Sequence, residues 1–174
     1  MAKHLIKPTG RESYFSDDEI IVSKTDLKGH LTYTNDVFLR VSGYTAKEII
    51  GQPHSIIRHP DMPRCIFKLL WDTISAKGEI FAYVVNLASN GDHYWVLAHV
   101  TPSFDAQGNV VGYHSNRRKP DSEKVEKIIP FYAGLLKEEG QVANRKDGMN
   151  NAYSCLLNTL NEKGISYDEF VLTL

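Results

Sequence analysis

The stretch IFAYVVNLASNGDHYWVLAHVTPSF, residues 80–104, decides the fold class of this chain. Two runs rich in β-branched and aromatic residues, at 80–88 and 93–104, flank the sequence SNGD, which is typical of a tight hairpin turn. A second turn sequence, DAQGN, leads into a third run of this kind at 110–118. Three consecutive strands joined by tight turns predict an antiparallel sheet.

Two shorter strands and several short helices precede this hairpin. The runs at 19–25 and 31–34 are joined by the turn sequence DLKGH. A short helix opens at Asn35, Thr45 begins a second one with a capping-box sequence, and 63–76 has the apolar spacing of a longer helix. This order predicts an α+β fold, in which a five-stranded antiparallel sheet carries short helices on one face.

The character of the chain changes after Pro120. Helices are predicted at 122–136 and 149–162, with a last short helix capped by Ser166, while the polar, glycine-containing stretch 137–148 is predicted to be mobile. The chain therefore divides into an N-terminal cap segment at 1–19, a central domain at 20–120 and a C-terminal helical tail at 121–174.

The composition is that of a soluble globular protein, with 42% hydrophobic and 24% charged residues. A net charge of -1 gives no electrostatic reason to expect nucleic acid or an acidic membrane as a partner. The apolar runs are too short to span a bilayer, and residues 1–8 lack the apolar core of a secretion signal. Cys65 and Cys155 form no paired motif for zinc or disulfides. We expect a cytoplasmic protein without direct membrane insertion.

A proline-rich bend, GQPHSIIRHPDMP at 51–63, concentrates polar chemistry between two apolar segments. Proline fixes its own φ and disfavours helix in the residue before it, so the bend is stiff and non-helical. Arg58, His59 and Asp61 are thereby able to point into a cleft. A polar loop between two helices is the alternative interpretation of the same residues.

These segments resemble the PAS domains of bacterial aerotaxis receptors, which bind flavin. The resemblance is carried by SKTDLKG, YTNDVF, VSGYT, the proline-rich bend and NGDHYWV, and it covers about residues 20–120. It implies the PAS fold, with 20–120 as a PAS sensor domain. The tail, with GISYDEF at 164–170, resembles the stand-alone PAS protein of bipartite energy-taxis sensors of the CetB type.

The resemblance implies a non-covalently bound FAD between the sheet and the short helices. The family residues carried over are Asn35, Arg58, His59, Asp61 and Asn86. Their chemistry suits the cofactor: a guanidinium offers a fork of donors to a diphosphate or a flavin carbonyl, and a strand asparagine both donates to and accepts from a flavin edge.

A second flavin-binding PAS group, the LOV photoreceptors, adds further expectations. The alignment places Arg117 near the glutamine that reads the flavin edge in that group, and His54 in the place of the photoreactive cysteine. Without that thiol, redox sensing fits better than light sensing. Ile80 stands where the aerotaxis pattern has a tryptophan, and Trp71 is one aromatic residue able to compensate near the flavin.

The implied function is that of a non-catalytic redox sensor for aerotaxis or energy taxis. Its partner would be a membrane-bound receptor of the methyl-accepting chemotaxis type, through which the protein becomes membrane-associated, and a homodimer through the sheet or the terminal helices is a further expectation. Two alternatives remain open. One is a PAS gas sensor that binds haem through one axial histidine, although 63–76 contains no histidine. The other is a cofactor-free interaction module.

Overall fold

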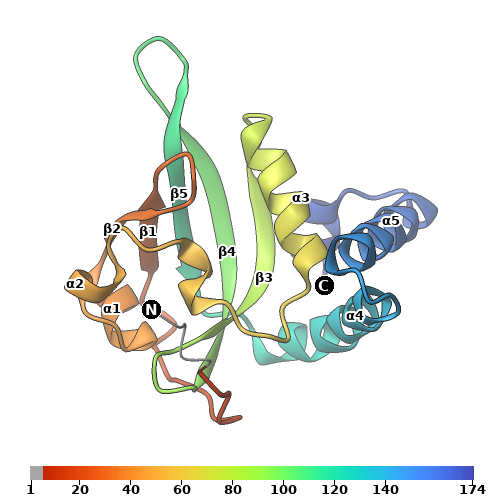
Figure 1. The fold of residues 1–174 in the computed structure, drawn as a ribbon, viewed down its shortest axis with the longest axis horizontal. Helices are drawn as coiled ribbons and strands as arrows, with labels where there is room; N and C mark the ends of the chain where they lie inside the picture. Colours follow the sequence, from red (N-terminus) through yellow and green to blue (C-terminus); the bar gives the residue numbers. More distant parts are fainter. Residues whose placement is uncertain (1–5) are drawn as a thin grey trace.

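Five strands form one antiparallel sheet in the computed structural model, which describes residues 6–174 (Figure 1). Their order across the sheet is β2-β1-β5-β4-β3, and helices are segregated from the strands, so the predicted α+β class is confirmed. The strands in chain order are β1 (Ile21–Thr25), β2 (Leu31–Thr34), β3 (Ile80–Leu87), β4 (His93–Phe104) and β5 (Val110–Arg118). The first five residues of the expected N-terminal cap segment, and of the stretch considered for a secretion signal, lie outside the described residues.

The first strand of the chain, β1, lies inside the sheet, beside the last strand, β5. β1 pairs with β5 in a register that sets Ser23 opposite Ser115 and Ile21 opposite Arg117. Because side chains alternate between the two faces of a strand, Ser23, Ser115 and Arg117 share one face. We call this the inner face.

Short helical segments and one longer helix cover this inner face, as Figure 1 shows. They are α1 (Asp36–Ser42), α2 (Ala46–Ile49), a 3₁₀ turn (His54–Ile57) and α3 (Arg64–Ser75), joined by the proline-rich bend. The Oδ1 of Asn35 accepts the Phe38 N–H at the start of α1, and the carboxylate of Glu48 accepts the Thr45 N–H at the start of α2. Side-chain caps therefore fix both helix starts, as the sequence predicted.

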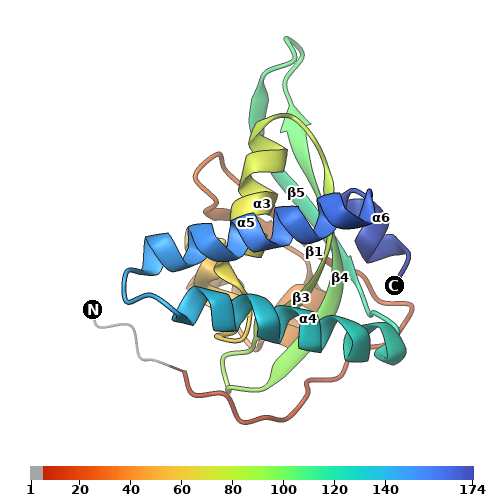
Figure 2. The same cartoon turned by 90° about the vertical axis from the view of Figure 1, so that its right-hand side faces the viewer.

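The C-terminal tail forms three helices: α4 (Ser122–Gly140), α5 (Arg145–Lys163) and α6 (Tyr167–Leu172). Figure 2 shows α4 and α5 as an antiparallel pair, with α5 crossing α3. The sequence predicts a mobile, non-helical stretch at 137–148, and this prediction is wrong for most of it, because only residues 141–144 separate the two helices. Gly148 is the reason that they approach closely here: a Cβ on it would lie 2.2 Å from the carbonyl oxygen of Glu139.

The tail is hydrogen-bonded to β3, the strand at one edge of the sheet. The Tyr132 hydroxyl of α4 donates to the Tyr83 carbonyl at 2.6 Å, and the Asp168 carboxylate of α6 accepts the Phe81 N–H at 2.9 Å. Trp95 of β4 stacks on Tyr132, with ring centroids 6.3 Å apart. α4 and α6 are therefore tied to the strand that also lines the inner face.

The described part of the N-terminal segment runs along the start of β4. His93 donates its N–H to the Arg11 carbonyl at 2.8 Å and accepts the Ser13 N–H at 2.7 Å. Of the helices within residues 6–174, none has the length and apolarity needed to cross a membrane.

Candidate ligand-binding site

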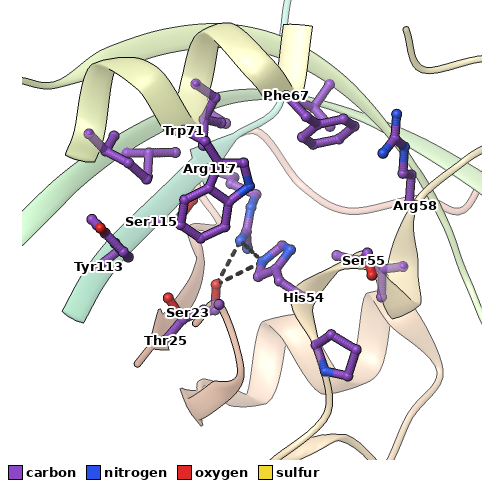
Figure 3. Close-up of a pocket in the computed structure, with 18 of the residues that line it drawn as sticks. Ser23, Thr25, His54, Ser55, Arg58, Phe67, Trp71, Tyr113, Ser115 and Arg117 are labelled. Atoms are coloured by element: carbon purple, nitrogen blue, oxygen red, sulfur yellow. Dashed lines mark hydrogen bonds between the residues drawn. The ribbon is translucent and has the colours of Figure 1, made fainter. Parts of the chain in front are cut away.

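A cavity of about 350 Å³ lies between the inner face of the sheet, the 3₁₀ turn and α3 (Figure 3). Its volume is at the lower end of the ~300–1,000 Å³ usual for small-molecule sites. Most of the wall is apolar, formed by Ile57, Phe67, Leu70, Trp71, Ile74, Val84, Ala98 and Val100. The polar lining side chains include Ser23, His54, Arg58, Asn86, Ser115 and Arg117. An apolar slot with a few directed polar groups suits a planar aromatic ligand.

The buried end of the cavity is built around Arg117 on β5. Its Nη2 donates to Ser23 Oγ at 2.6 Å and to His54 Nε2 at 2.5 Å, the bonds drawn in Figure 3. An imidazole nitrogen that accepts from a guanidinium carries no proton, so His54 is neutral. Burial, with a smaller contribution from the Arg117 cation, lowers the pKa of His54 to about 3. Burial also lowers the pKa of Arg117 to about 10, which leaves it charged at pH 7.

Three buried polar atoms on this lining have no partner among the residues that the structure describes. They are Asn86 Nδ2, Ser115 Oγ and Arg117 Nη1. Each such group costs about 1–3 kcal/mol when left unbonded. One amide donor, one guanidinium donor and a hydroxyl on residues that line one apolar slot suit the carbonyl and ring-nitrogen edge of a flavin.

Arg58 and Trp71 line the part of the cavity that is formed by the proline-rich bend and α3. The Arg58 guanidinium lies 4.2 Å from the centroid of the Phe67 ring and donates to the Met62 carbonyl at 3.3 Å. Its backbone also bridges to Asn86 on β3. Arg58 is therefore held by its own backbone and by an aromatic face while its side chain lines the cavity.

The Trp71 indole packs edge-on against Tyr113, with ring centroids 5.4 Å apart, and 37% of the residue is exposed. It approaches Gly29 so closely that a Cβ there would lie 3.0 Å from the ring. Gly29 has a φ of +80°, a backbone conformation that favours glycine, and the Trp71 ring leaves no room for a larger side chain.

Four of the seven residues predicted to bind the cofactor thus line one cavity: Arg58, Trp71, Asn86 and Arg117. The other three do not line it. Asn35 has its amide bonded at both ends, with Oδ1 accepting from Val22 and Phe38 and Nδ2 donating to the Ile20 carbonyl. The carboxamide therefore joins α1 to β1, which its position before a helix had also indicated.

His59 and Asp61 shape the bend instead of facing the cavity. The His59 ring is buried beneath the bend, where its Nδ1 accepts the Asp61 N–H at 3.1 Å and its ring meets His93 edge-on. Burial lowers the pKa of His59. The Asp61 side chain is 78% exposed. Asn35, His59 and Asp61 do not line the cavity, and their direct contact with a cofactor stays a prediction.

Sequence reasoning left Ser23, His54 and Ser115 out of the predicted binding set. Ser115 and Arg117 lie two residues apart on one strand, which signals a shared face, but Ser23 joins them only through the β1–β5 register. Among residues 6–174, no three His, Cys, Asp or Glu side chains cluster as metal ligands would.

Comparisons with known proteins agree with this geometry. The model of the PAS fold family matches residues 31–117. The aerotaxis receptor of Escherichia coli (strain K12) is 41% identical over 128 residues, which are 73% of this chain and 25% of that protein. A nitrogen fixation regulatory protein of Klebsiella pneumoniae is 27% identical over 99 residues, 57% of this chain and 20% of that protein. The chain thus spans a quarter or less of these relatives.

Among solved structures, the dark state of the blue-light photoreceptor Aureochrome1 LOV superposes with a TM-score of 0.56. The two are 22% identical, and the match covers 67% of this chain and 86% of that one. An RNA-binding light-oxygen-voltage receptor gives a TM-score of 0.57 at 20% identity, over 70% of this chain and 35% of that one. At these identities the likeness shows the fold alone. The fold, the family match over half of the chain and the aerotaxis relative together establish that this protein belongs to the PAS fold family.

Proposed function

We propose that this protein is a redox sensor that binds FAD in the cavity behind α3. The observation that carries the proposal is a set of unpartnered buried polar atoms on Asn86, Ser115 and Arg117, three residues that line one apolar slot. Support also comes from the sequence resemblance to flavin-binding PAS domains and from a neighbouring fold, a light-oxygen-voltage domain studied with a flavin analogue, at 16% identity and a TM-score of 0.56.

A bound flavin would supply a ring system that exchanges electrons and changes its protonation. The residues of this chain would then have three tasks. The apolar walls exclude water from the ring, Asn86 and Arg117 donate to its polar edge, and neutral His54 holds the Arg117 guanidinium in place. Because donors at that edge meet a different acceptor pattern after reduction, the hydrogen bonds on β3 and β5 change with the redox state.

β3 offers a route from the cavity to the tail. It presents Asn86 to the cavity, while the backbone of Tyr83 and Phe81 on the same strand bonds to α4 and α6. A shift of this strand would therefore alter the seating of the tail helices. We propose that the tail and the sheet present the redox state to a membrane-bound chemotaxis receptor, with the protein itself cytoplasmic, non-catalytic and without nucleic-acid binding. The alternative partner for the sheet or the tail helices is a second copy of this chain, which would form a homodimer.

The absorption spectrum of the purified protein tests the cofactor. The proposal expects bound flavin that is identified as FAD after release by heat, and its loss in Arg117→Ala. Arg118→Ala is the matched control, since Arg118 is the exposed neighbour on the same strand. A Soret band would instead indicate haem, for which His54 and His114 are the histidines that line the cavity. Colourless protein that takes up no flavin would indicate a cofactor-free interaction module.

The redox role is tested by partner affinity. The receptor candidate should bind the oxidised protein and the dithionite-reduced protein with different affinities. A change of ~1–3 kcal/mol in hydrogen bonding corresponds to a difference of roughly five- to over a hundredfold. Equal affinities for the two states would refute signalling through this partner.

A further inference from the structure

We propose that the groove between α3 and α5 binds the diphosphate and adenosine of the dinucleotide, so that the C-terminal tail selects FAD over FMN. The inference rests on the proposed flavin site and names a subsite for it. The groove has a volume of about 460 Å³, and its lining includes Arg58, Phe67 and Trp71 from the PAS domain and Lys146, Met149 and Asn150 from α5. The ligand proposed for this groove belongs to the nucleoside diphosphate esters.

The groove adjoins the cavity. Arg58, Phe67 and Trp71 line both spaces, with Arg58 stacked on Phe67 between them. The lining of the cavity is mostly apolar, which suits the three-ring flavin but not the two phosphates of a dinucleotide. A ligand whose ring occupies the cavity would therefore leave past these three side chains and enter the groove.

The charges of the groove suit a diphosphate. Two of its cations are already paired: Arg64 Nε donates to the buried Glu139 carboxylate at 2.9 Å, and Lys68 Nζ to Asp72 at 2.7 Å. Within residues 6–174, no carboxylate lies within ion-pair distance of the other two, Arg58 and Lys146. These two unpaired cations both line the groove, and Arg58 lines the cavity as well, so an anionic group bound in the groove would neutralise both.

The position of Lys146 on α5 adds to this field. α5 begins at Arg145, which places Lys146 in its first turn, and the Lys146 side chain lines the groove. Met149 lies one turn further along, opposite the partly exposed Trp71. A thioether and an indole are suitable surfaces for the flat face of an adenine. Lys146 and Met149 lie outside the segment 31–117 matched by the family, so this subsite belongs to the tail of this chain.

Flavin titrations of the apoprotein test the proposal, with FAD, FMN and riboflavin followed by quenching of flavin fluorescence. Lys146→Ala should weaken FAD roughly tenfold, which corresponds to about 1.4 kcal/mol, and Lys146→Glu should weaken it further. Riboflavin, which has no phosphate, should bind all variants equally. Lys163→Ala, an exposed lysine at the far end of the same helix, is the control and should leave all three ligands unchanged.

The outcomes separate this inference from the proposed function. Tight riboflavin binding with identical FAD affinity in wild type, Lys146→Ala and Lys146→Glu would overturn the groove subsite and leave the flavin cavity standing. Wild-type protein that binds none of the three flavins would overturn both. Equal wild-type affinity for FAD and FMN would overturn the selection of the dinucleotide by the tail.

Discussion

The buried pair of Arg117 and His54 is an unusual arrangement of two basic side chains. Arg117 keeps its charge inside the protein, and His54 remains neutral as its acceptor, with Ser23 as the second acceptor. No buried carboxylate bonds to Arg117 among the described residues. A cation without an anion favours a ligand that offers carbonyl oxygens or gains negative charge, which is the reason that Arg117 is central to the proposed site.

The neutral state of His54 predicts a pH dependence of stability. The pKa of His54 is lowered from 6.5 to about 3 on folding, so below pH 6.5 the unfolded chain binds a proton that the folded chain does not. The stabilisation is therefore complete above pH 6.5 and is lost as the pH falls. For one such group the loss between pH 7 and pH 5 is about 2 kcal/mol.

Urea unfolding at pH 7 and pH 5 measures this effect. In His54→Gln, which keeps an acceptor for Arg117 but cannot titrate, the loss of unfolding free energy between the two pH values should be about 2 kcal/mol smaller than in wild type. Other histidines, such as His59, contribute to both proteins and cancel in the difference. An identical pH dependence would show that His54 is protonated in the folded protein.

Arg58 predicts a separable effect on cofactor binding. Its backbone bridge to Asn86 does not depend on its side chain, so Arg58→Ala should release most bound FAD while the far-UV circular dichroism and the unfolding midpoint of the apoprotein change little. Arg58→Lys keeps the charge but not the fork of donors, and should retain an intermediate amount. Full retention of flavin by Arg58→Ala would remove this residue from the site.

At the scale of elements, local signals in the sequence were sufficient for most boundaries. The hairpin turns, the caps at Asn35 and Thr45 and the proline before α3 each act within a few residues, and the structure has these elements where they were predicted. The stretch 137–148 was misjudged because its glycines and polar residues indicate a loop locally. Position 148 requires a glycine because α4 and α5 approach closely there, and this requirement comes from a tertiary contact with Glu139 that local sequence does not reveal.

Two glycines in the tail predict opposite responses to the same substitution. A Cβ on Gly134 of α4 would meet no atom within 4 Å, so Gly134→Ala should gain helix propensity and stabilise the protein by up to about 1 kcal/mol. A Cβ on Gly148 would collide with the Glu139 backbone, so Gly148→Ala should destabilise it by about 1–3 kcal/mol. Chemical denaturation of both variants provides the measurement. Stabilisation by Gly148→Ala would contradict the close crossing of α4 and α5.

At the scale of the whole molecule, the sequence could not bring the site together. It identified Arg58, Trp71, Asn86 and Arg117 individually, and all four line the cavity. It could not identify Ser23 as a partner of Arg117, because their contact depends on which residues of β1 and β5 pair. It also could not place α5 beside α3, since a helical pattern specifies an apolar face but not its partner.

The seating of the tail predicts one cooperative unfolding unit. α4 and α6 are bonded to β3, so the sheet and the tail should melt together. FAD at a hundredfold excess over its Kd should raise the free energy of unfolding by about 2.7 kcal/mol and shift that single transition upwards. Differential scanning calorimetry with and without FAD tests both statements. Two separate transitions would show that residues 20–120 and 121–174 unfold independently.

The pairing of β1 with β5 has a consequence for biosynthesis. Because Ile21 pairs with Arg117, β1 and β5 cannot join until residue 117 has left the ribosome. The proposed flavin site therefore cannot form early, and folding must wait for a late, long-range closure of the kind that slows β-rich domains. An arrest peptide placed before residue 118 should yield translation intermediates without any flavin, whatever the supply in the cell.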